Sequence, residues 1–334
     1  MSKEPLSKDR SSPRIAVAGA GAIGCTLAAI LAHAGQAVSL LARGATLQAI
    51  QSQGIELRRQ AQTYQVPVTV SDDAHTLGTQ DIVFLCAKSH DLVGLAQAAT
   101  PLIGPKTLIV PMVNGVPWWY FERLPGQDGR RVKSVDPEGR LRALLPSAQV
   151  VGVVQFMTAE RVGPGSVVSN TPALLILGEI DHTESQRVQS IVDVLNASGI
   201  ESRHSAQIRD PLWMKIIANL TTNPLSVLTG ATLNTMYGDS RLLPITRKML
   251  FEGLALAAAH GARIPLDPNT IIQETIAMGA VRTSMLQDYE HGNPLELAAI
   301  GDAVLELADA IHLPMPTARD VIAMAHYRGT TQRR

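Results

Sequence analysis

The stretch Arg14-Ile-Ala-Val-Ala-Gly-Ala-Gly-Ala-Ile-Gly24 decides the fold of the N-terminal half of the chain. It begins as a short apolar strand, and its three glycines run into an alanine-rich helix that reaches about His33. Gly35 ends that helix, and residues 37–43 predict the next strand. A strand, a glycine-rich turn, a helix and a second strand form the unit that binds the pyrophosphate of a dinucleotide.

Each glycine of this turn has its own task in such a unit. Gly19 allows the tight turn, Gly21 lets the backbone approach the pyrophosphate, and Gly24 lets the helix pack on the strand. The N-terminus of the helix then faces the phosphate charge. The alternative is that the glycines serve a tight turn alone. The predicted cofactor-binding residues of the turn are Gly19, Ala20, Gly21, Ala22, Ile23 and Gly24.

The residue that ends the second strand discriminates between the two nicotinamide cofactors. An acidic residue there hydrogen-bonds the ribose 2′-hydroxyl of NADH, whereas an arginine accommodates the 2′-phosphate of NADPH. This chain has Arg43, and no Asp or Glu occurs between Gly19 and Gly44. The sequence therefore predicts NADPH as the cofactor, and a solvated loop cation is the alternative reading of Arg43.

Polar residues also follow two later strands. Residues 81–87 predict a buried strand that leads to Lys88, and residues 107–113 predict another that ends at Asn114. Ligands of open α/β sheets bind at the carboxyl ends of the strands, so both residues are candidates for the cofactor site, and Asn114 also for the substrate site. A solvated lysine and an Asn-Gly turn are the alternatives.

A second constellation lies in the C-terminal half, where Lys215, Asn219 and Asn223 recur every four residues in an apolar run over 212–228. Steps of four drift only about 40° each around a helix axis, so the three side chains share one face. A lysine among apolar side chains loses solvation, which disfavours its ammonium form and makes it a proton donor near neutral pH. The alternative is an amphipathic helix whose polar side faces water.

Length and composition fit a two-domain enzyme. The 334 residues exceed what one hydrophobic core usually supports. A net charge of zero with a pI near 7.1 does not indicate binding to nucleic acid or to a membrane surface. Residues 1–13 are expected to be a floppy tail rather than a signal peptide. Cys25 and Cys86 read as buried hydrophobes rather than a disulfide, which predicts a reducing, cytoplasmic location. The oligomeric state stays open, with a homodimer among the alternatives.

The rest of the pattern completes an α/β chain with a helical end. After a loose excursion over 117–146, residues 149–156 predict a strand that resumes the sheet. Further strands are expected at 167–168 and 173–177, and helices at 184–197, 245–261, 268–280 and 296–311. We therefore predict a Rossmann-type dinucleotide-binding domain over 14–205 and an all-helical substrate and catalytic domain over 206–334.

With these residues laid out, the chain resembles the ketopantoate reductase family, the NADP-dependent 2-dehydropantoate 2-reductases of pantothenate biosynthesis, over nearly its whole length. The residues that carry the resemblance are the glycine turn with Arg43, Lys88, Asn114-Gly115, the helix with Lys215, Asn219 and Asn223-Pro224, and Ser284-Met-Leu-Gln-Asp288 followed by Glu296.

The resemblance implies a substrate site in a cleft between the two domains. In that family the residue that matches Lys215 is the general acid, and the residues that match Asn219, Asn223, Ser284 and Glu296 arrange the substrate. The residue that matches Asn114 sits beside cofactor and substrate. We expect Glu296 to act with Lys215 by ion pairing, which would oppose the effect of burial on the lysine pKa. The alternatives are a helix cap for Ser284 and a first-turn acid at a helix N-terminus for Glu296.

The sequence thus predicts NADPH-dependent reduction of a small 2-oxo acid, with 2-dehydropantoate as the leading substrate. A hydride added to the keto carbon leaves a developing alkoxide, and a nearby ammonium both stabilises that charge and supplies the proton. A reductase of the same architecture for another 2-oxo acid is one alternative. A nicotinamide-binding sensor without turnover is another, although it would need neither Lys215 nor Glu296.

Two features depart from the family pattern. Val281 stands where family members commonly carry an asparagine, so one polar substrate contact is missing. Trp118 and Trp119 follow Asn114-Gly115, and they would either wall the substrate pocket or pack under the loop over 125–146. No histidine shows metal-ligand spacing, so no metal site is expected, and His90 is expected at the surface.

Overall fold

The computed structural model describes residues 12–59, 62–127 and 129–331. The predicted tail over 1–13 lies outside these residues apart from its last two positions. The described residues of Met1–Val113, Phe121–Arg130 and Gly139–Ile208 form one compact unit, and those of Asn114–Tyr120, Arg131–Glu138 and Arg209–Arg334 form the other. No helix within the described ranges combines the length and the apolar character needed to span a membrane.

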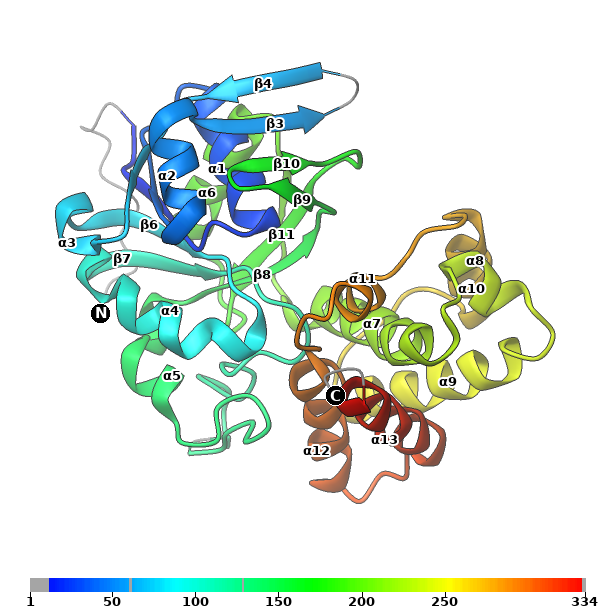
Figure 1. Cartoon of the computed structure of the whole chain (residues 1–334). Helices are drawn as coiled ribbons and strands as arrows, with labels where there is room; N and C mark the ends of the chain where they lie inside the picture. Colours follow the sequence, from blue (N-terminus) through cyan, green and yellow to red (C-terminus); the bar gives the residue numbers. More distant parts are fainter. Residues whose placement is uncertain (1–11, 60–61, 128, 332–334) are drawn as a thin grey trace. The chain divides into compact units, whose positions relative to one another are not determined.

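A parallel sheet of five strands forms the centre of the first unit (Figure 1). The order is β5-β2-β1-β6-β7. The strands are β1 (Ile15–Ala18), β2 (Val38–Leu41), β5 (Thr69–Ser71), β6 (Gln80–Leu85) and β7 (Ile103–Pro111). Helix α1 (Ala22–His33) connects β1 to β2, and the chain returns on the other side of β1 as β6. Ligands of open α/β sheets bind where the strand order reverses in this way, at the carboxyl ends of the strands.

Two smaller sheets complete the first unit. One has the order β4-β3-β10-β9, formed by β3 (Ile55–Arg59), β4 (Gln62–Val66), β9 (Glu160–Gly163) and β10 (Ser166–Val168). The other has the order β12-β11-β8, formed by β8 (Val151–Phe156), β11 (Leu174–Glu179) and β12 (Glu201–His204). The helices of this unit are α2 (Gly44–Gln53), α3 (Ala74–Leu77), η1 (Ser89–Asp91), α4 (Leu92–Ala99), η2 (Thr100–Leu102), α5 (Arg140–Leu144), η3 (Ser147–Gln149) and α6 (Gln186–Ala197).

The expectation that residues 149–156 resume the central sheet is wrong for most of that strand. β8 pairs antiparallel with β11, and only an isolated bridge between Ile109 and Val150 joins this segment to β7. β8 is buried at five of its six positions, so its burial pattern alone does not show which of the two sheets it joins.

The helix expected over 184–197, the two buried cysteines and the surface position of His90 are confirmed in the first unit. Ser185 caps α6 by accepting a hydrogen bond from the backbone of Val188, and Gly199 follows its end with φ +79°. Cys25 and Cys86 are free and buried, and burial raises the pKa of both thiols. They pack as apolar side chains rather than as reactive thiolates. His90 is exposed, as expected.

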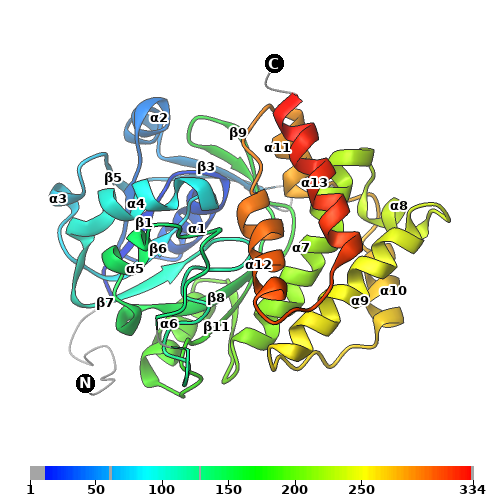
Figure 2. The same ribbon diagram turned by 90° about the horizontal axis from the view of Figure 1, so that it is seen from below.

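The second unit is helical throughout its C-terminal part, which confirms the predicted fold class. Its helices are α7 (Arg209–Thr229), α8 (Leu233–Gly238), α9 (Leu243–Ala259), α10 (Pro268–Ala277), α11 (Ser284–Glu290), the π-helical turn η4 (Ala298–Asp302), α12 (Ala303–Asp309) and α13 (Pro316–Thr331). Helix α7 packs against α9, α11 and α13 (Figure 2). The segment expected as one helix over 296–311 is therefore divided into η4 and α12.

Two partly buried carboxylates accept hydrogen bonds from backbone N–H groups of this unit. Glu252 on α9 accepts hydrogen bonds from the backbone N–H groups of Thr317 and Ala318, which lie in the first turn of α13. Glu306 on α12 accepts from the backbone of Lys133 and Ser134 in the same way. The second of these contacts joins the segment over 131–138 to the helical unit. Charge-assisted bonds of this kind satisfy backbone donors that would otherwise lack partners.

Candidate functional site

The glycine turn lies where the carboxyl ends of three parallel strands meet. The backbone N–H of Gly19 donates to Leu41 at the end of β2, and Cys86 after β6 donates to Ala18 at the end of β1. Gly19 has φ +99°, and a Cβ there would lie 2.4 Å from the carbonyl oxygen of Cys86. A Cβ at Gly24 would lie 1.9 Å from the carbonyl oxygen of Gly19. Neither position therefore tolerates a side chain.

Gly21 differs from the other two glycines because a Cβ there would meet open space. It is the N-cap residue of α1, and the helix start has no side-chain cap and no acidic residue in its first turn. The N–H groups of the first turn and the positive end of the helix dipole are thus left for an anionic ligand. The residues present fit the pyrophosphate of a dinucleotide.

Arg43 and Lys88 each follow a strand that pairs with β1, the strand that leads into this turn. Arg43 comes two residues after Leu41 and directly precedes α2. It is exposed, and its guanidinium forms no hydrogen bond or ion pair with another residue of the described ranges. Lys88 comes two residues after Cys86, directly before η1, and is partly buried rather than fully solvated.

The predicted polar stripe of α7 is partly to fully withdrawn from water. Lys215 and Asn219 are partly buried, and Asn223 is only 3% exposed. Burial lowers the pKa of Lys215 from 10.5 to about 8, and the charge of Glu296 opposes part of this shift. The polar stripe of α7 is therefore only partly solvated, and its last member is withdrawn from water. With this pKa, Lys215 can give up its proton at neutral to mildly alkaline pH.

Glu296 and Asn114 are brought into the same unit by the π-helical turn. Glu296 is 4% exposed and lies two residues before η4, which packs on α7. The backbone N–H of Val116 donates to the carbonyl oxygen of Ala299 in η4. Gly115 has φ +80°, and a Cβ there would lie 2.4 Å from the same oxygen. The residue after Asn114 must therefore be glycine for this segment to lie against the turn.

Ser284 lies at the first position of α11 with its side chain exposed. The cap of this helix is Thr283, whose hydroxyl accepts a hydrogen bond from the backbone of Leu286 at 3.1 Å. The reading of Ser284 as the helix cap is therefore wrong. Asn223 donates to Asn219 Oδ1, and its own Oδ1 accepts from the backbone of Met285. The asparagine thus fixes the start of α11 on α7 as well as belonging to the predicted stripe.

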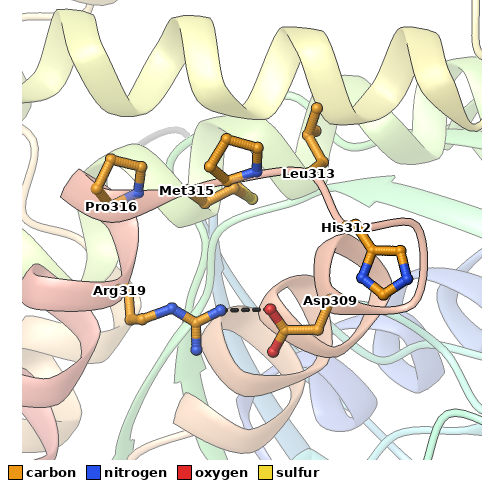
Figure 3. A pocket seen from close by; sticks show the side chains of 7 residues that line it. Asp309, His312, Leu313, Met315, Pro316 and Arg319 are labelled. Carbon is orange, nitrogen blue, oxygen red and sulfur yellow. Dashed lines mark hydrogen bonds and ion pairs between the residues drawn. The ribbon is translucent and has the colours of Figure 1, made fainter.

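An open pocket of about 570 Å³ lies elsewhere in the second unit, where α12 ends and α13 begins (Figure 3). Its rim carries the ion pair of Arg319 with Asp309, in which each charge satisfies the other. None of the predicted site residues lines this pocket. Its lining residues are Asp309, His312, Leu313, Pro314, Met315, Pro316 and Arg319.

Comparison with known proteins places the chain in a family. The profile of the family described as ketopantoate reductase PanE/ApbA matches residues 15–182, and the profile of its C-terminal domain matches residues 207–328. A 2-dehydropantoate 2-reductase from Mesorhizobium japonicum is 37% identical over 93% of this chain and 96% of its own length. The chain belongs to the ketopantoate reductase family.

Solved structures of similar proteins agree with this assignment. A provisionally named ketopantoate reductase from Ralstonia solanacearum MolK2 superposes with a TM-score of 0.91 at 37% identity, covering 96% of this chain and 99% of the other. A 2-dehydropantoate 2-reductase from Geobacter metallireducens GS-15 superposes with a TM-score of 0.83 at 25% identity, covering 94% and 99%. The expectation of an oxidoreductase of this family is confirmed.

As a ketopantoate reductase family member, the chain carries its candidate residues in two groups. The glycine turn, Arg43 and Lys88 belong to the first unit. The helical unit contains Lys215, Asn219, Asn223, Ser284, Glu296 and Asn114, the last of which follows β7 and belongs to the segment that packs on η4. The roles of all these residues in binding and catalysis stay predictions.

The aromatic residues after Asn114 do not form an open wall. Trp118 and Trp119 are 4% and 1% exposed, and the guanidinium of Arg209 lies 5.6 Å from the ring centre of Trp119. Arg209 also donates to the carbonyl oxygen of Tyr120, whose hydroxyl accepts from Trp213. The hypothesis of a pocket wall is not supported, because aromatic surface that packs on a buried cation is not available to a substrate.

The departure at Val281 has a clear structural setting. Its carbonyl oxygen accepts a hydrogen bond from the backbone of Leu233, and its side chain is 38% exposed. Valine cannot donate or accept a hydrogen bond through its side chain, so an apolar group stands three residues before Ser284. Thr283, Ser226 and the π-helical turn were not predicted from the sequence. Thr283 carries a signal, since threonine is a preferred N-cap residue, but the adjacent Ser284 carries the same one.

The open space at Gly21 leads to a direct test of the cofactor turn. We expect Gly21→Ala to leave the melting temperature nearly unchanged, because the added methyl meets no protein atom within 4 Å. NADPH affinity should fall about tenfold, since forcing a methyl into a close contact costs on the order of 1–3 kcal/mol. Gly94→Ala is the matched control, because Gly94 lies in α4 and its Cβ would also meet open space. Equal NADPH dissociation constants for wild type and Gly21→Ala, measured by fluorescence titration, would contradict this role for the turn.

Proposed function

We propose that this protein reduces a small 2-oxo acid to the 2-hydroxy acid with NADPH, and that 2-dehydropantoate is the leading substrate. The proposal rests on Lys215, a partly buried lysine on α7. Burial lowers its pKa to about 8, and it interacts electrostatically with the buried Glu296. Membership of the ketopantoate reductase family supports the reaction class.

Lys215 acts as the general acid in this proposal. When bound, NADPH supplies the hydride for the keto carbon. Reduction leaves negative charge on the substrate oxygen, and the Lys215 ammonium stabilises that charge and donates its proton from Nζ. A pKa near 8 suits this task, because the lysine is mostly protonated at neutral pH and still gives up its proton readily.

Glu296 keeps Lys215 protonated at working pH. Burial alone disfavours the ammonium, and the negative charge of Glu296 raises the lysine pKa against that effect. Asn219, Asn223 and Ser284 present two amides and a hydroxyl from α7 and α11. We infer that Asn219 and Ser284, the more exposed of the three, contact the polar groups of the acid, while Asn223 holds them in place.

Arg43 and the glycine turn select the cofactor. The exposed guanidinium of Arg43 follows β2, where an arginine accommodates the 2′-phosphate of NADPH. The fold alone does not choose between cofactors or substrates. A D-mandelate dehydrogenase solved with NADH and anilino(oxo)acetate has the same fold, with a TM-score of 0.82 at 18% identity.

The proposal is tested by NADPH absorbance on mixing with a panel of 2-oxo acids. The panel contains 2-dehydropantoate and matched acids that lack its hydroxyl group or carry a bulkier apolar group. We expect the highest kcat/KM for 2-dehydropantoate. A higher value for another acid identifies a reductase of a different 2-oxo acid, in line with the apolar Val281. NADPH binding without oxidation by any acid would identify a sensor and refute the proposed reaction.

The tuning of Lys215 by Glu296 predicts a specific pH dependence. In the wild type, kcat should be level at neutral pH and fall as the pH rises through about 8, because only protonated Lys215 is an acid. Glu296→Gln removes the charge that raises the lysine pKa, so the fall should move to lower pH. Steady-state profiles of both proteins measure the shift. A fall at the same pH in both would show that Glu296 does not set the protonation of the acid.

A further inference from the structure

A chain of buried hydroxyl groups links α7 to the start of α11. Ser226 on α7 is fully buried, and its hydroxyl lies 2.6 Å from that of Thr283, which is 7% exposed. The Ser226 hydroxyl donates a hydrogen bond to the carbonyl oxygen of Asn223 at 2.7 Å. The Thr283 hydroxyl accepts a hydrogen bond from the backbone N–H of Leu286 at 3.1 Å. The two hydroxyl groups therefore join one turn of α7 to the first turn of α11.

Counting the available protons shows which group donates in each of these hydrogen bonds. Each hydroxyl has one proton, and that of Ser226 goes to the carbonyl oxygen of Asn223. The proton between the two hydroxyl groups must then come from Thr283. Hydrogen bonds that follow one direction polarise each other, and a buried chain with every member satisfied rigidifies the elements that it joins.

Ser284 stands directly after this junction, with the backbone of Met285 on its other side bonded to Asn223 Oδ1. Hydrogen bonds from α7 thus hold the residues on both sides of Ser284. Its own side chain is exposed. Lys215 and Asn219 lie on α7, whereas Ser284 lies on α11. The position of the Ser284 hydroxyl relative to these two residues therefore depends on this junction.

We propose that Ser226 and Thr283 are positioning residues for the reaction, which act by fixing the Ser284 hydroxyl relative to the polar stripe of α7. This inference rests on the proposed reduction of a 2-oxo acid. Neither residue contacts substrate in this account. Their contribution is the placement of Ser284, and it should appear mainly in the KM of the acid.

The test is a double-mutant cycle between Thr283→Val and Ser284→Ala, with the acid of the panel that has the highest kcat/KM. Valine keeps the shape of threonine and removes the hydroxyl. We expect Thr283→Val to raise KM about five- to tenfold, which is the usual size of one hydrogen bond's contribution. In the Ser284→Ala background the same change should alter KM less than about twofold, since coupled residues are not additive. Thr283→Ser keeps both hydrogen bonds and should restore the wild-type KM.

Controls separate positioning from loss of stability. Thr246→Val is matched, because Thr246 is fully buried in the same unit and its hydroxyl bonds backbone carbonyl groups of α8 and of the start of α9. It should lower the melting temperature without raising KM. Ser226→Ala breaks the link but leaves Thr283 as the helix cap, and it replaces Thr283→Val in the cycle if that variant does not fold.

Three results would overturn the proposal in an active enzyme. The first is that the two changes in KM multiply fully in the double mutant. The second is that Thr283→Val has the KM of the wild type. The third is that Thr283→Ser does not have the wild-type KM. An inactive wild type on every acid of the panel refutes the proposed reaction itself, and with it this inference. The two failures are thus distinguishable before any variant is made.

Discussion

Lys215→Ala should lower kcat by about 10²–10⁴, the range typical of a positioned proton donor. The side chain stands on α7 with a pKa lowered to about 8, and alanine can neither stabilise the developing alkoxide nor protonate it. NADPH affinity should be nearly unchanged, because the glycine turn and Arg43 belong to the other unit. Single-turnover oxidation of NADPH in the presence of the acid measures the chemical step directly.

The control for this variant is Lys248→Ala, which removes an exposed lysine from α9 of the same unit. It should leave turnover unchanged. Melting curves of both variants are needed, since a lysine with only a structural role predicts a lower melting temperature and near-normal turnover per folded molecule. That result would remove Lys215 from the mechanism.

Arg43→Ala should weaken NADPH binding by roughly tenfold to a hundredfold and leave NADH binding unchanged. A charge-assisted hydrogen bond to a phosphate contributes on the order of 1.5 to 3 kcal/mol, and only NADPH carries the 2′-phosphate. Arg43 is exposed after β2, so the loss of its side chain should not disturb the fold. Titration of each cofactor against wild type and variant gives four dissociation constants that form a complete cycle.

Arg203→Ala is the matched control for charge, because Arg203 is an exposed arginine of the same unit on β12. It should not alter the ratio of the two affinities. Equal affinities of the wild type for NADPH and NADH would rule out the assignment of Arg43 to the 2′-phosphate. So would equal losses for both cofactors in Arg43→Ala.

Local sequence patterns were sufficient for the elements that carry the candidate site. The glycine spacing of residues 19–24 specifies a turn between β1 and α1, and the structure shows why, since Cβ atoms at Gly19 and Gly24 would overlap backbone oxygens. The steps of four along α7 placed Lys215, Asn219 and Asn223 on one face because helix periodicity is a local property. Both predictions rest on neighbours within a few turns of chain.

Features that depend on distant partners could not be predicted in this way. β10 pairs with β3, more than a hundred residues earlier, and neither strand shows in its own sequence which partner it takes. The choice of Thr283 over Ser284 as the cap of α11 depends on Ser226, 57 positions earlier in the sequence. The burial of Trp119 depends on Arg209, which the sequence places 90 positions later. Tertiary packing decided each of these cases.

The reaction that we propose is the transfer of hydride from NADPH to the keto carbon of a 2-oxo acid. It is tested most directly by a reaction with NADPH that carries deuterium at both C4 positions, followed by mass spectrometry of the acid. We expect a 2-hydroxy acid that carries one deuterium at carbon 2, formed by the wild type and about 10²–10⁴ times more slowly by Lys215→Ala. Binding of NADPH without any deuterated 2-hydroxy acid from the whole panel would contradict it.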